Sequence, residues 1–387
     1  MQHIYLDNSA TTALCPAARD KIVAAMEVYG NPSSLHRAGR DAAALLSEAR
    51  GAIARSLGLR KLSAGELVFT SCGSEADSLA ILGVAHAKER RTASRIVTTD
   101  SEHPAVENVM QQLEREGFEV VRIPTRGGML DMDAVDAALD KNVLLVSMML
   151  VNNETGARYD LKRVFSLAKA RNPQVVTHTD AVQGYLKGLL TPASLGADLI
   201  SISAHKVHGP KGVGALYINP ALLKAKQIVP FLLGGGQESG LRSGTENVLG
   251  IAAFGAAVAY LYPRMSEDVA HMTALRDETV ERLNALDIAV KLPSGDRAPH
   301  IINLTLPNIK SETMLHHLDA RGICVSSGSA CSSHARALSR ALTAFGCSDR
   351  EVDCSVRVSL CPDTTRADID ALIEGLSDGL DRLIRIK

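Results

Sequence analysis

The sequence predicts an α/β fold: a large domain built on a mainly parallel, seven-stranded sheet, followed by a smaller α+β domain. Three observations support this class. The chain has 387 residues, 46% of them hydrophobic, so it is long enough for two or three domains with buried cores. From about residue 65 to 220, short β-rich runs alternate with amphipathic helical patterns, which is typical of βαβ units. Polar side chains follow the ends of several of these runs.

The predicted strands of the large domain are 66–70, 95–99, 119–123, 143–150, 175–178, 199–203 and 214–218. In open sheets of this kind, ligands bind outside the carboxyl ends of the strands. Residues that titrate or form hydrogen bonds stand at those ends, in the segments 71–74, 102–103, 152–154, 180–183 and 203–206. We therefore expect one polar rim along the sheet, where a ligand site would lie.

A second pattern follows a glycine-rich loop at 234–236. The least polar stretch, 248–262, has 15 uncharged residues, fewer than the about 20 that span a bilayer, and predicts a buried helix. After it we expect helices at 264–289, 311–321 and 366–384, and strands at 301–306, 323–326 and 356–359. Residues 15–249 would form the large domain, and 1–14 with 250–387 the small domain.

Composition excludes several classes of protein. Forty-two Lys and Arg against 43 Asp and Glu give a net charge of −1, so there is no overall positive field for nucleic acid or an anionic membrane. Six Phe, seven Tyr and no Trp are too few for a surface built on base stacking. Residues 1–12 lack the basic and apolar regions of a secretory signal. We expect a cytoplasmic protein that binds neither nucleic acid nor membrane.

The seven cysteines are odd in number, and no two have the C-x-x-C spacing of a metal or redox site. We therefore expect no disulfide framework, no metal site and mostly inert thiols. Cys331 differs, because Gly328 and four serines surround it in a segment typical of an exposed loop. It is the one cysteine whose surroundings suit reactivity, with a chance cysteine in a polar loop as the alternative.

An anion site is predicted where the strand 66–70 leads through small residues into a helix. The backbone N–H groups of Gly73 and Ser74, the Ser74 hydroxyl and the positive end of the helix dipole could together hold a phosphate. The alternative is an ordinary capped helix, since Ser74 followed by Asp77 resembles a capping box.

Lys206 and Asp180 stand at the ends of two other apolar runs. A lysine there loses hydration, which lowers its pKa and favours a neutral amine able to form a Schiff base. An aspartate there needs a cationic partner, such as a pyridinium. The alternatives are a surface lysine, which Lys211 fits better, and a helix N-cap for Asp180. A phosphate site, a lysine and an aspartate on one rim are the parts that a pyridoxal 5'-phosphate site requires.

Two further residues could act at this rim. His103 could stack on a flat ring or move protons near neutral pH, or it could be a buried core histidine. Arg357 lies in an apolar strand pattern, where either a clamp on a substrate carboxylate or a structural ion pair would explain it.

Ten motifs, in order and at approximate spacing, resemble the pyridoxal phosphate-dependent cysteine desulfurases of the NifS/IscS class. They are YLDNSATT (5–12), GNPSSLH (30–36), FTSCGSE (69–75), EH (102–103), VNNETG (151–156), HTDAVQ (178–183), SAHK (203–206), RSGTEN (242–247), SSGSAC (326–331) and VRVSL (356–360). The resemblance covers nearly the whole chain. It implies the class V aminotransferase family and fold type I of the pyridoxal phosphate enzymes.

The resemblance also implies roles for the cofactor site. Lys206 would bind the cofactor covalently, Asp180 would pair with its ring nitrogen, and His103 would stack on its ring. Asn153 and Gln183 would contact its hydroxyl side. The residues implied to bind its phosphate are Gly73, Ser74, Ser203, His205 and, from the second subunit of a homodimer, Thr245.

For the substrate, the resemblance implies that Asn153 and Arg357 hold the carboxylate of L-cysteine. Cys331 would then attack the substrate sulfur, leaving L-alanine and a persulfide that passes to an acceptor protein. That acceptor would be an iron–sulfur scaffold or a protein of tRNA or cofactor thiolation.

The chain departs from the family pattern at several places. Gln237 and Ser239 replace a usual His and Arg, and Cys361-Pro362 replaces Gly-Arg. Residues 336–339 replace Leu-Glu-Pro-Ser, and the chain ends at Lys387 without the extension that docks a scaffold in several members. Delivery to a standard scaffold is therefore less firmly implied than desulfuration. A selenocysteine lyase, an aminotransferase-like enzyme, a β-lyase and a non-catalytic binding protein are the alternatives.

Overall fold

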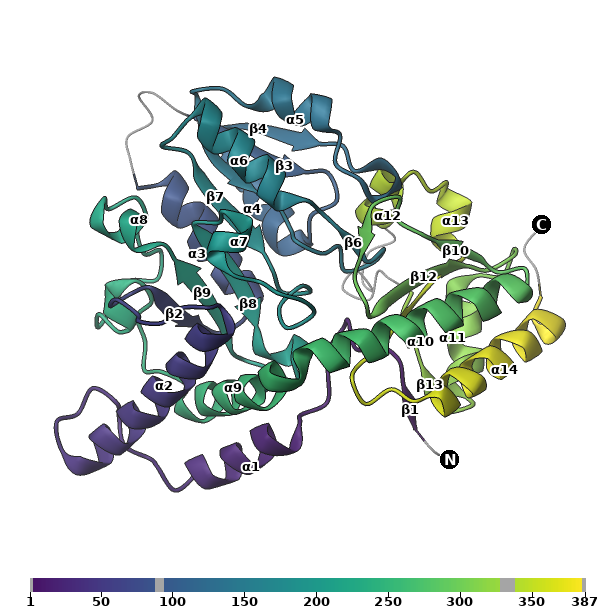
Figure 1. Cartoon of the computed structure of the whole chain (residues 1–387), viewed down its shortest axis with the longest axis horizontal. Coiled ribbons are helices and arrows are strands. Elements are labelled where there is room, and N and C mark those ends of the chain that lie inside the picture. Colours follow the sequence, from purple (N-terminus) through teal and green to yellow (C-terminus); the bar gives the residue numbers. More distant parts are fainter. Residues whose placement is uncertain (1–2, 88–93, 328–337, 385–387) are drawn as a thin grey trace.

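The large domain is built on one seven-stranded sheet, and the computed structural model describes residues 3–87, 94–327 and 338–384 (Figure 1). In sheet order the strands are β2 (Leu67–Thr70), β9 (Gly214–Ile218), β8 (Leu199–Ser203), β7 (Val176–Asp180), β5 (Val143–Ser147), β3 (Arg95–Thr99) and β4 (Glu119–Ile123). Strand β9 runs in the opposite direction to the other six strands. The prediction of a mainly parallel, seven-stranded sheet is confirmed.

Alternate side chains of the strands enter two different apolar cores. In β9, Leu216 and Ile218 belong to one core, and Ala215 and Tyr217 to the other, because successive residues of a strand point to opposite faces. The first core is covered by α3 (Gly73–Ala85), α4 (Pro104–Arg115) and α8 (Pro220–Lys224). The second is covered by α2 (Arg37–Ser56), α5 (Met132–Ala138), α6 (Leu161–Arg171), α7 (Pro192–Leu195) and α9 (Val248–Leu261).

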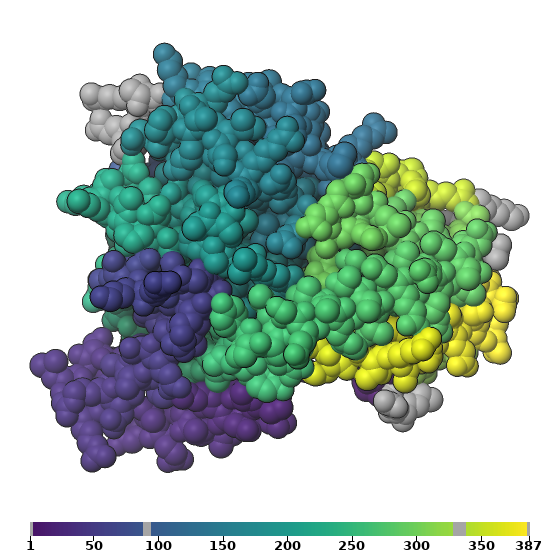
Figure 2. Space-filling model, viewed as in Figure 1, coloured from purple at the N-terminus to yellow at the C-terminus, as the bar shows by residue number. Residues whose placement is uncertain are grey.

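The apolar helix α9 packs against α2 and against α1 (Pro16–Ala25), which protrude as a lobe of the molecule (Figure 2). A Cβ atom added to Gly255 would lie 2.4 Å from the Cα of Ala49, so the two backbones touch. Together with the following helix, α9 forms the one described stretch, Val248–Ala285, that is long and apolar enough to cross a membrane by composition. Half of its most apolar window is buried inside the protein, as expected of a core helix.

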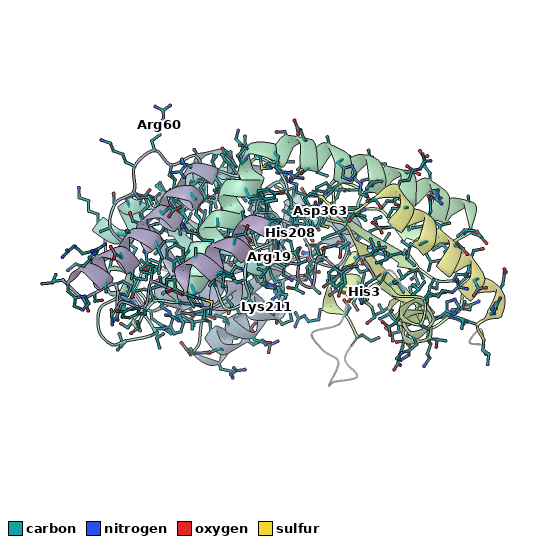
Figure 3. All side chains as sticks on the ribbon, turned by 90° about the horizontal axis from the view of Figure 1, so that it is seen from below. His3, Arg19, Arg60, His208, Lys211 and Asp363 are labelled. Carbon is teal, nitrogen blue, oxygen red and sulfur yellow. The ribbon has the colours of Figure 1, made fainter. Side chains whose placement is uncertain are left out.

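The smaller α+β part has its own sheet and core. Strands β10 (Ala289–Lys291), β12 (Ile301–Thr305) and β14 (Ser355–Ser359) pair antiparallel, and β1 (Ile4–Tyr5) pairs in parallel with β13 (Ile323–Cys324). The core between them is formed with α10 (Met265–Ala285), α11 (Ser311–Asp319) and α14 (Arg366–Arg382). Figure 3 shows the N-terminal helices at one end of the molecule and α14 at the other.

The remaining short elements are β6 (Ala157–Arg158) and β11 (Asp296–Arg297), which pair with each other, α12 (Arg340–Phe345), α13 (Asp349–Asp353), and the 3-10 turns η1 (Arg126–Gly128), η2 (Ala204–Lys206), η3 (Glu238–Gly240) and η4 (Tyr262–Arg264). Helix α10 is shorter than the predicted 264–289, because Asp287 adopts a left-handed φ of 57° and β10 follows. The division of the chain at residue 249 stays a prediction. The structure adds that residue 249 falls in the first turn of α9 (Val248–Leu261), and that α9 packs against α1 and α2.

Candidate active site

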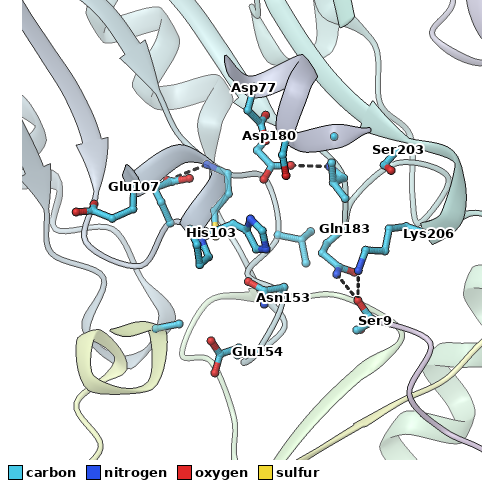
Figure 4. Close-up of a pocket in the computed structure, with 18 of the residues that line it drawn as sticks. Ser9, Asp77, His103, Glu107, Asn153, Glu154, Asp180, Gln183, Ser203 and Lys206 are labelled. Atoms are coloured by element: carbon cyan, nitrogen blue, oxygen red, sulfur yellow. Dashed lines mark hydrogen bonds between the residues drawn. The ribbon is translucent and has the colours of Figure 1, made fainter. Parts of the chain in front are cut away.

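A pocket of about 450 Å³ lies at the carboxyl ends of the large-sheet strands, where residues of the smaller part and of the N-terminal segment meet them (Figure 4). Ten of the predicted site residues line it: Gly73, Ser74, His103, Asn153, Asp180, Gln183, Ser203, His205, Lys206 and Arg357. The predicted polar rim is therefore present, since these residues lie around one pocket.

Lys206 follows β8 in the turn η2 and points across the pocket toward the N-terminal segment (Figure 4). Its ammonium donates hydrogen bonds to the backbone carbonyls of Ser9 and Ala10, the latter at 2.7 Å. The alternative of a lysine in a surface turn is therefore wrong for Lys206.

Asp180 ends β7 and is 7% exposed. One of its oxygens accepts a hydrogen bond from the N–H of Val182 at 2.9 Å, and a turn rather than a helix follows. Burial raises the pKa of Asp180 to about 6, while the nearby Lys206 ammonium acts to lower it. Among the described residues no cationic side chain pairs directly with this carboxylate, and a cationic group in the pocket would supply such a partner.

The first turn of α3 forms a cradle for an anion. Its N-cap residue, Cys72, makes no side-chain capping bond. The backbone N–H groups of the first turn, where Gly73 and Ser74 line the pocket, therefore have no capping side chain as acceptor. The hydroxyl of Ser203 is buried and has no hydrogen-bond partner among the described residues. A Cβ atom on Gly73 would lie 2.8 Å from Cγ2 of Val182, so only glycine fits this position without displacing a neighbour.

The capping-box alternative for this helix is wrong. Asp77 does not fold back to cap α3 but is 1% exposed, and burial together with the charge of Asp180 raises its pKa well above the usual range. The open helix terminus, the partnerless Ser203 hydroxyl and the glycine together fit an anion of the size of a phosphate group.

His103 caps α4, since its Nδ1 accepts a hydrogen bond from the N–H of Ala105 at 3.1 Å. Burial and the Lys206 charge lower the pKa of His103 to about 4, so the ring is neutral at physiological pH. Because Nδ1 accepts a bond, the ring proton resides on Nε2. The side chain is therefore both a local cap and a neutral hydrogen-bond donor at the pocket.

Arg357 comes from β14 and is 3% exposed. Its Nη2 donates to Oδ1 of Asp7 at 2.8 Å, and its Nη1 donates to the carbonyl oxygen of Asn153 at 3.0 Å. The structural ion pair considered as an alternative is present. Its Nε is buried without a hydrogen-bond partner in the described part of the chain, and Nη1 and Nη2 each retain one of their two protons for a ligand.

Gln183 and His205 are held by neighbours at the pocket wall. The amide of Gln183 donates to the carbonyl of Ser9 at 2.9 Å, and its oxygen lies 3.4 Å from Nε2 of His300. Nδ1 of His205 lies 3.2 Å from the hydroxyl of Thr11. The N-terminal segment therefore contributes to the site; it was one of the ten family motifs, but no site role was predicted for Ser9 or Ala10.

Two further acids, Glu102 and Asp77, are buried at the pocket, and the sequence predicted no site role for either. Glu102 is 5% exposed, and burial raises its pKa to about 8. It accepts bonds from the Thr99 hydroxyl at 2.6 Å and the N–H of Met149 at 3.0 Å. Asp77 is the second acid. The sequence did contain a signal for both: Glu102 follows the end of β3, and Asp77 is an acidic residue in the mainly apolar α3.

Two predicted site residues remain. Cys331 lies outside the described residues, and Thr245 is exposed and does not line the pocket. Cys72 does line it, whereas Cys361 does not. Within the described ranges, no group of three or more His, Cys, Asp and Glu side chains could hold a metal ion.

Comparisons with known proteins agree with this architecture. The family model for aminotransferase class-V matches residues 4–372. The chain is 38% identical to a cysteine desulfurase of Trichormus azollae, over 99% of this chain and 94% of that protein. It is 37% identical to the cysteine desulfurase IscS of Dictyoglomus turgidum, over 99% of this chain and 95% of the relative.

Among solved structures, a NifS-like protein superposes with a TM-score of 0.91 at 34% identity, covering 99% of this chain and all of that one. A structure of SspA in complex with cysteine has a TM-score of 0.78 at 30% identity, with 93% of this chain and 99% of that chain covered. These likenesses confirm the predicted fold type I architecture. The chain belongs to the class-V aminotransferase family and, within it, to the cysteine desulfurases.

Proposed function

We propose that the protein is a pyridoxal phosphate-dependent cysteine desulfurase, which takes sulfur from L-cysteine and leaves L-alanine. The observation that supports the proposal most is the gathering of ten predicted site residues, from both parts of the fold, around one pocket. The relatives named above carry the same activity in their names.

The pocket offers a partner for each part of the cofactor. The α3 terminus at Gly73 and Ser74, with Ser203 and His205, would hold the phosphate, and Asp180 would pair with the ring nitrogen. Asn153 and Gln183 would lie on the hydroxyl side of the ring, and Lys206 would bind it covalently. When bound, pyridoxal phosphate draws electrons from the bonds at the α-carbon of an amino acid, which makes its α-proton acidic.

The chain's own side chains then direct the reaction. Arg357 holds the substrate carboxylate, and Nζ of Lys206 takes the α-proton and returns a proton to the carbon skeleton. His103, neutral and protonated on Nε2, adds no second positive charge beside Lys206. The buried carboxylate of Asp180 would hold a proton on the ring nitrogen of the bound cofactor.

Sulfur leaves by attack of the Cys331 thiolate on the substrate sulfur. A sulfur–sulfur bond forms, the bond between the substrate's Cβ and its sulfur breaks, and that electron pair takes up a proton at Cβ to complete the methyl group of alanine. One thiol and one cysteine give one persulfide and one alanine, so no outside oxidant or reductant is required.

We also propose a cytoplasmic homodimer that passes the persulfide sulfur to an iron–sulfur scaffold or a thiolation protein. The lobe formed by α1, α2 and the segment between them carries exposed apolar side chains, which suits a contact with a second copy. Tyr29 and Leu35 are 90% and 91% exposed there.

The test is to supply L-cysteine and a thiol reductant to the cofactor-loaded protein and to quantify alanine and sulfide in parallel. We expect equal yields from the natural chain and none from Cys331→Ala, with Cys347→Ala, a thiol outside the pocket, as the matched control. Pyruvate with ammonia, or normal sulfide release from Cys331→Ala, would contradict the proposal and favour a β-lyase. Preference for selenocysteine would favour a lyase of that class.

A further inference from the structure

The contact between Asp7 and Arg357 joins two residues 350 positions apart, at the end of the pocket assigned to the substrate carboxylate. Oδ1 of Asp7 accepts a hydrogen bond from Nη2 of Arg357 at 2.8 Å. Of the two side chains, Arg357 is 4% exposed and Asp7 18%. A guanidinium this deeply buried requires an anion nearby, and Asp7 is that anion.

The segment that carries Asp7 is fixed to the same strand that carries Arg357. The N–H of Ser9 donates to the hydroxyl of Ser359 at 2.8 Å, the amide of Asn8 donates to the carbonyl of Ser359 at 2.9 Å, and the N–H of Ser359 donates to the carbonyl of Leu6 at 2.7 Å. Ser359 follows Arg357 by two residues, so both point to the same side of β14. These bonds hold the Asp7 carboxyl group at a set place relative to the guanidinium.

The donors of Arg357 are not all used. Nη2 bonds to Asp7 and Nη1 bonds to the carbonyl of Asn153, while Nε is buried without a partner in the described part of the protein. Nη1 and Nη2 each carry two protons, and each has one acceptor among the described residues. Each therefore retains a proton that a carboxylate could accept.

We propose that Asp7 is a positioning residue for the substrate: it fixes the Arg357 guanidinium at the wall of the pocket, where that guanidinium receives the α-carboxylate of the amino acid. The inference rests on the proposed function for the identity of the substrate. It adds that Asp7, an acidic residue of the N-terminal motif for which the sequence predicted no role, sets the geometry of the carboxylate site.

The test measures binding of L-alanine, which has the α-carboxylate but no sulfur, to the cofactor-loaded protein by the change in its visible absorption. Ethylamine, which lacks the carboxylate, is the matched probe. In Asp7→Ala we expect about tenfold weaker L-alanine binding, the loss of one positioned charge-assisted bond, and ethylamine binding within about twofold. Asp7→Asn keeps an oxygen that accepts from Nη2 and should restore L-alanine binding to within about threefold.

The control variant is Asp378→Ala, which removes a carboxylate that is 19% exposed and paired with Arg321 on the far side of the smaller part. It should leave both probes unchanged. Equal weakening of L-alanine and ethylamine in Asp7→Ala would overturn the proposal, as would unchanged L-alanine binding, or weakening in Asp7→Asn as large as in Asp7→Ala. A protein that binds L-alanine as expected but releases no sulfur from L-cysteine would refute the proposed function and leave the role of Asp7 intact.

Discussion

At the scale of single residues, the side chains at strand ends were the predictable part of the site. Asp180 and Lys206 follow apolar runs, and the physics of a buried charge marks such residues from sequence alone. What each contacts could not be predicted, because Lys206 donates to Ser9 and Ala10, nearly 200 positions away. Arg357 shows the same limit: a clamp and an ion pair were alternatives in the sequence, and the structure contains the ion pair while leaving Nε without a partner.

Ser203 supports a prediction about cofactor binding. Its hydroxyl is buried without a protein partner in the described structure, so Ser203→Ala should leave the unfolding free energy of the cofactor-free protein within about 0.5 kcal/mol. Cofactor affinity should fall about tenfold, since one charge-assisted hydrogen bond to the phosphate is lost. Equilibrium dialysis with pyridoxal phosphate measures the second quantity, and unchanged affinity would place the phosphate elsewhere.

Glu102 supports a prediction about pH. Its pKa is raised by burial from 4.5 to about 8, so its protonated form stabilises the folded state below about pH 4.5 and that contribution is lost as the pH rises through 8. When the pH is raised from 5 to 9, the unfolding free energy of the natural chain should fall. The fall in Glu102→Gln should be smaller by about 2 kcal/mol or more. Urea unfolding at both pH values checks this, and parallel pH curves would show that Glu102 is ionised in the folded state.

At the scale of elements, the strands of the large sheet were predictable because their apolar runs are bounded by small and polar residues. Their ends were less so: the predicted strand at 143–150 stops at Ser147, although Met148 to Leu150 remain buried. The short strands β1 and β10 were not predicted, because two or three residues carry no periodicity. The start of α3 shows a local error. The sequence suggested a capping box with Asp77, but Asp77 is buried in the protein and the N-cap residue is Cys72.

The start of α3 supports a prediction about packing. Gly73→Ala would place a methyl group 2.8 Å from the stiff side chain of Val182, which should cost about 1–3 kcal/mol of stability and disturb the anion cradle. The double variant Gly73→Ala with Val182→Ala removes that methyl contact and should recover most of the loss. Chemical unfolding of the single and double variants measures it, with Val182→Ala alone as the control; additive losses would argue against the clash.

At the scale of the whole molecule, the pocket exists because three distant parts of the chain meet. The strand ends of the large domain, Arg357 of the smaller part and the segment Asp7 to Ala10 enclose the same space. The large sheet and the smaller α+β part could be predicted from patterns of apolar residues. The meeting of their edges could not, since no local pattern encodes which surfaces face each other.

The dimer proposed for the molecule supports a prediction about Thr245. If Thr245 completes the site of a second copy, chains with Lys206→Ala and chains with Thr245→Ala should regain activity when unfolded and refolded together. Each mixed dimer then has one site with both residues natural, and at equal amounts one site in four is of this kind. Alanine formation measures the recovery. A mixture no more active than the average of the two variants would place Thr245 in its own chain's site, or in none.

The bond between Asp7 and Arg357 also bears on how the protein is made. The residues that lie between positions 73 and 206 emerge from the ribosome well before Arg357 does, and chains begin to fold from the N-terminal side during synthesis. The N-terminal segment must then wait for β14, its partner across 350 positions, before it can take its place. The entropic cost of closing so long a loop is only slightly larger than that of a shorter one. The length of the loop nevertheless means that the N-terminal segment docks after β14 has been made. A chain that ends before β14 therefore holds the strand ends that line the pocket but not Arg357, and the pocket is complete only once β14 has been made.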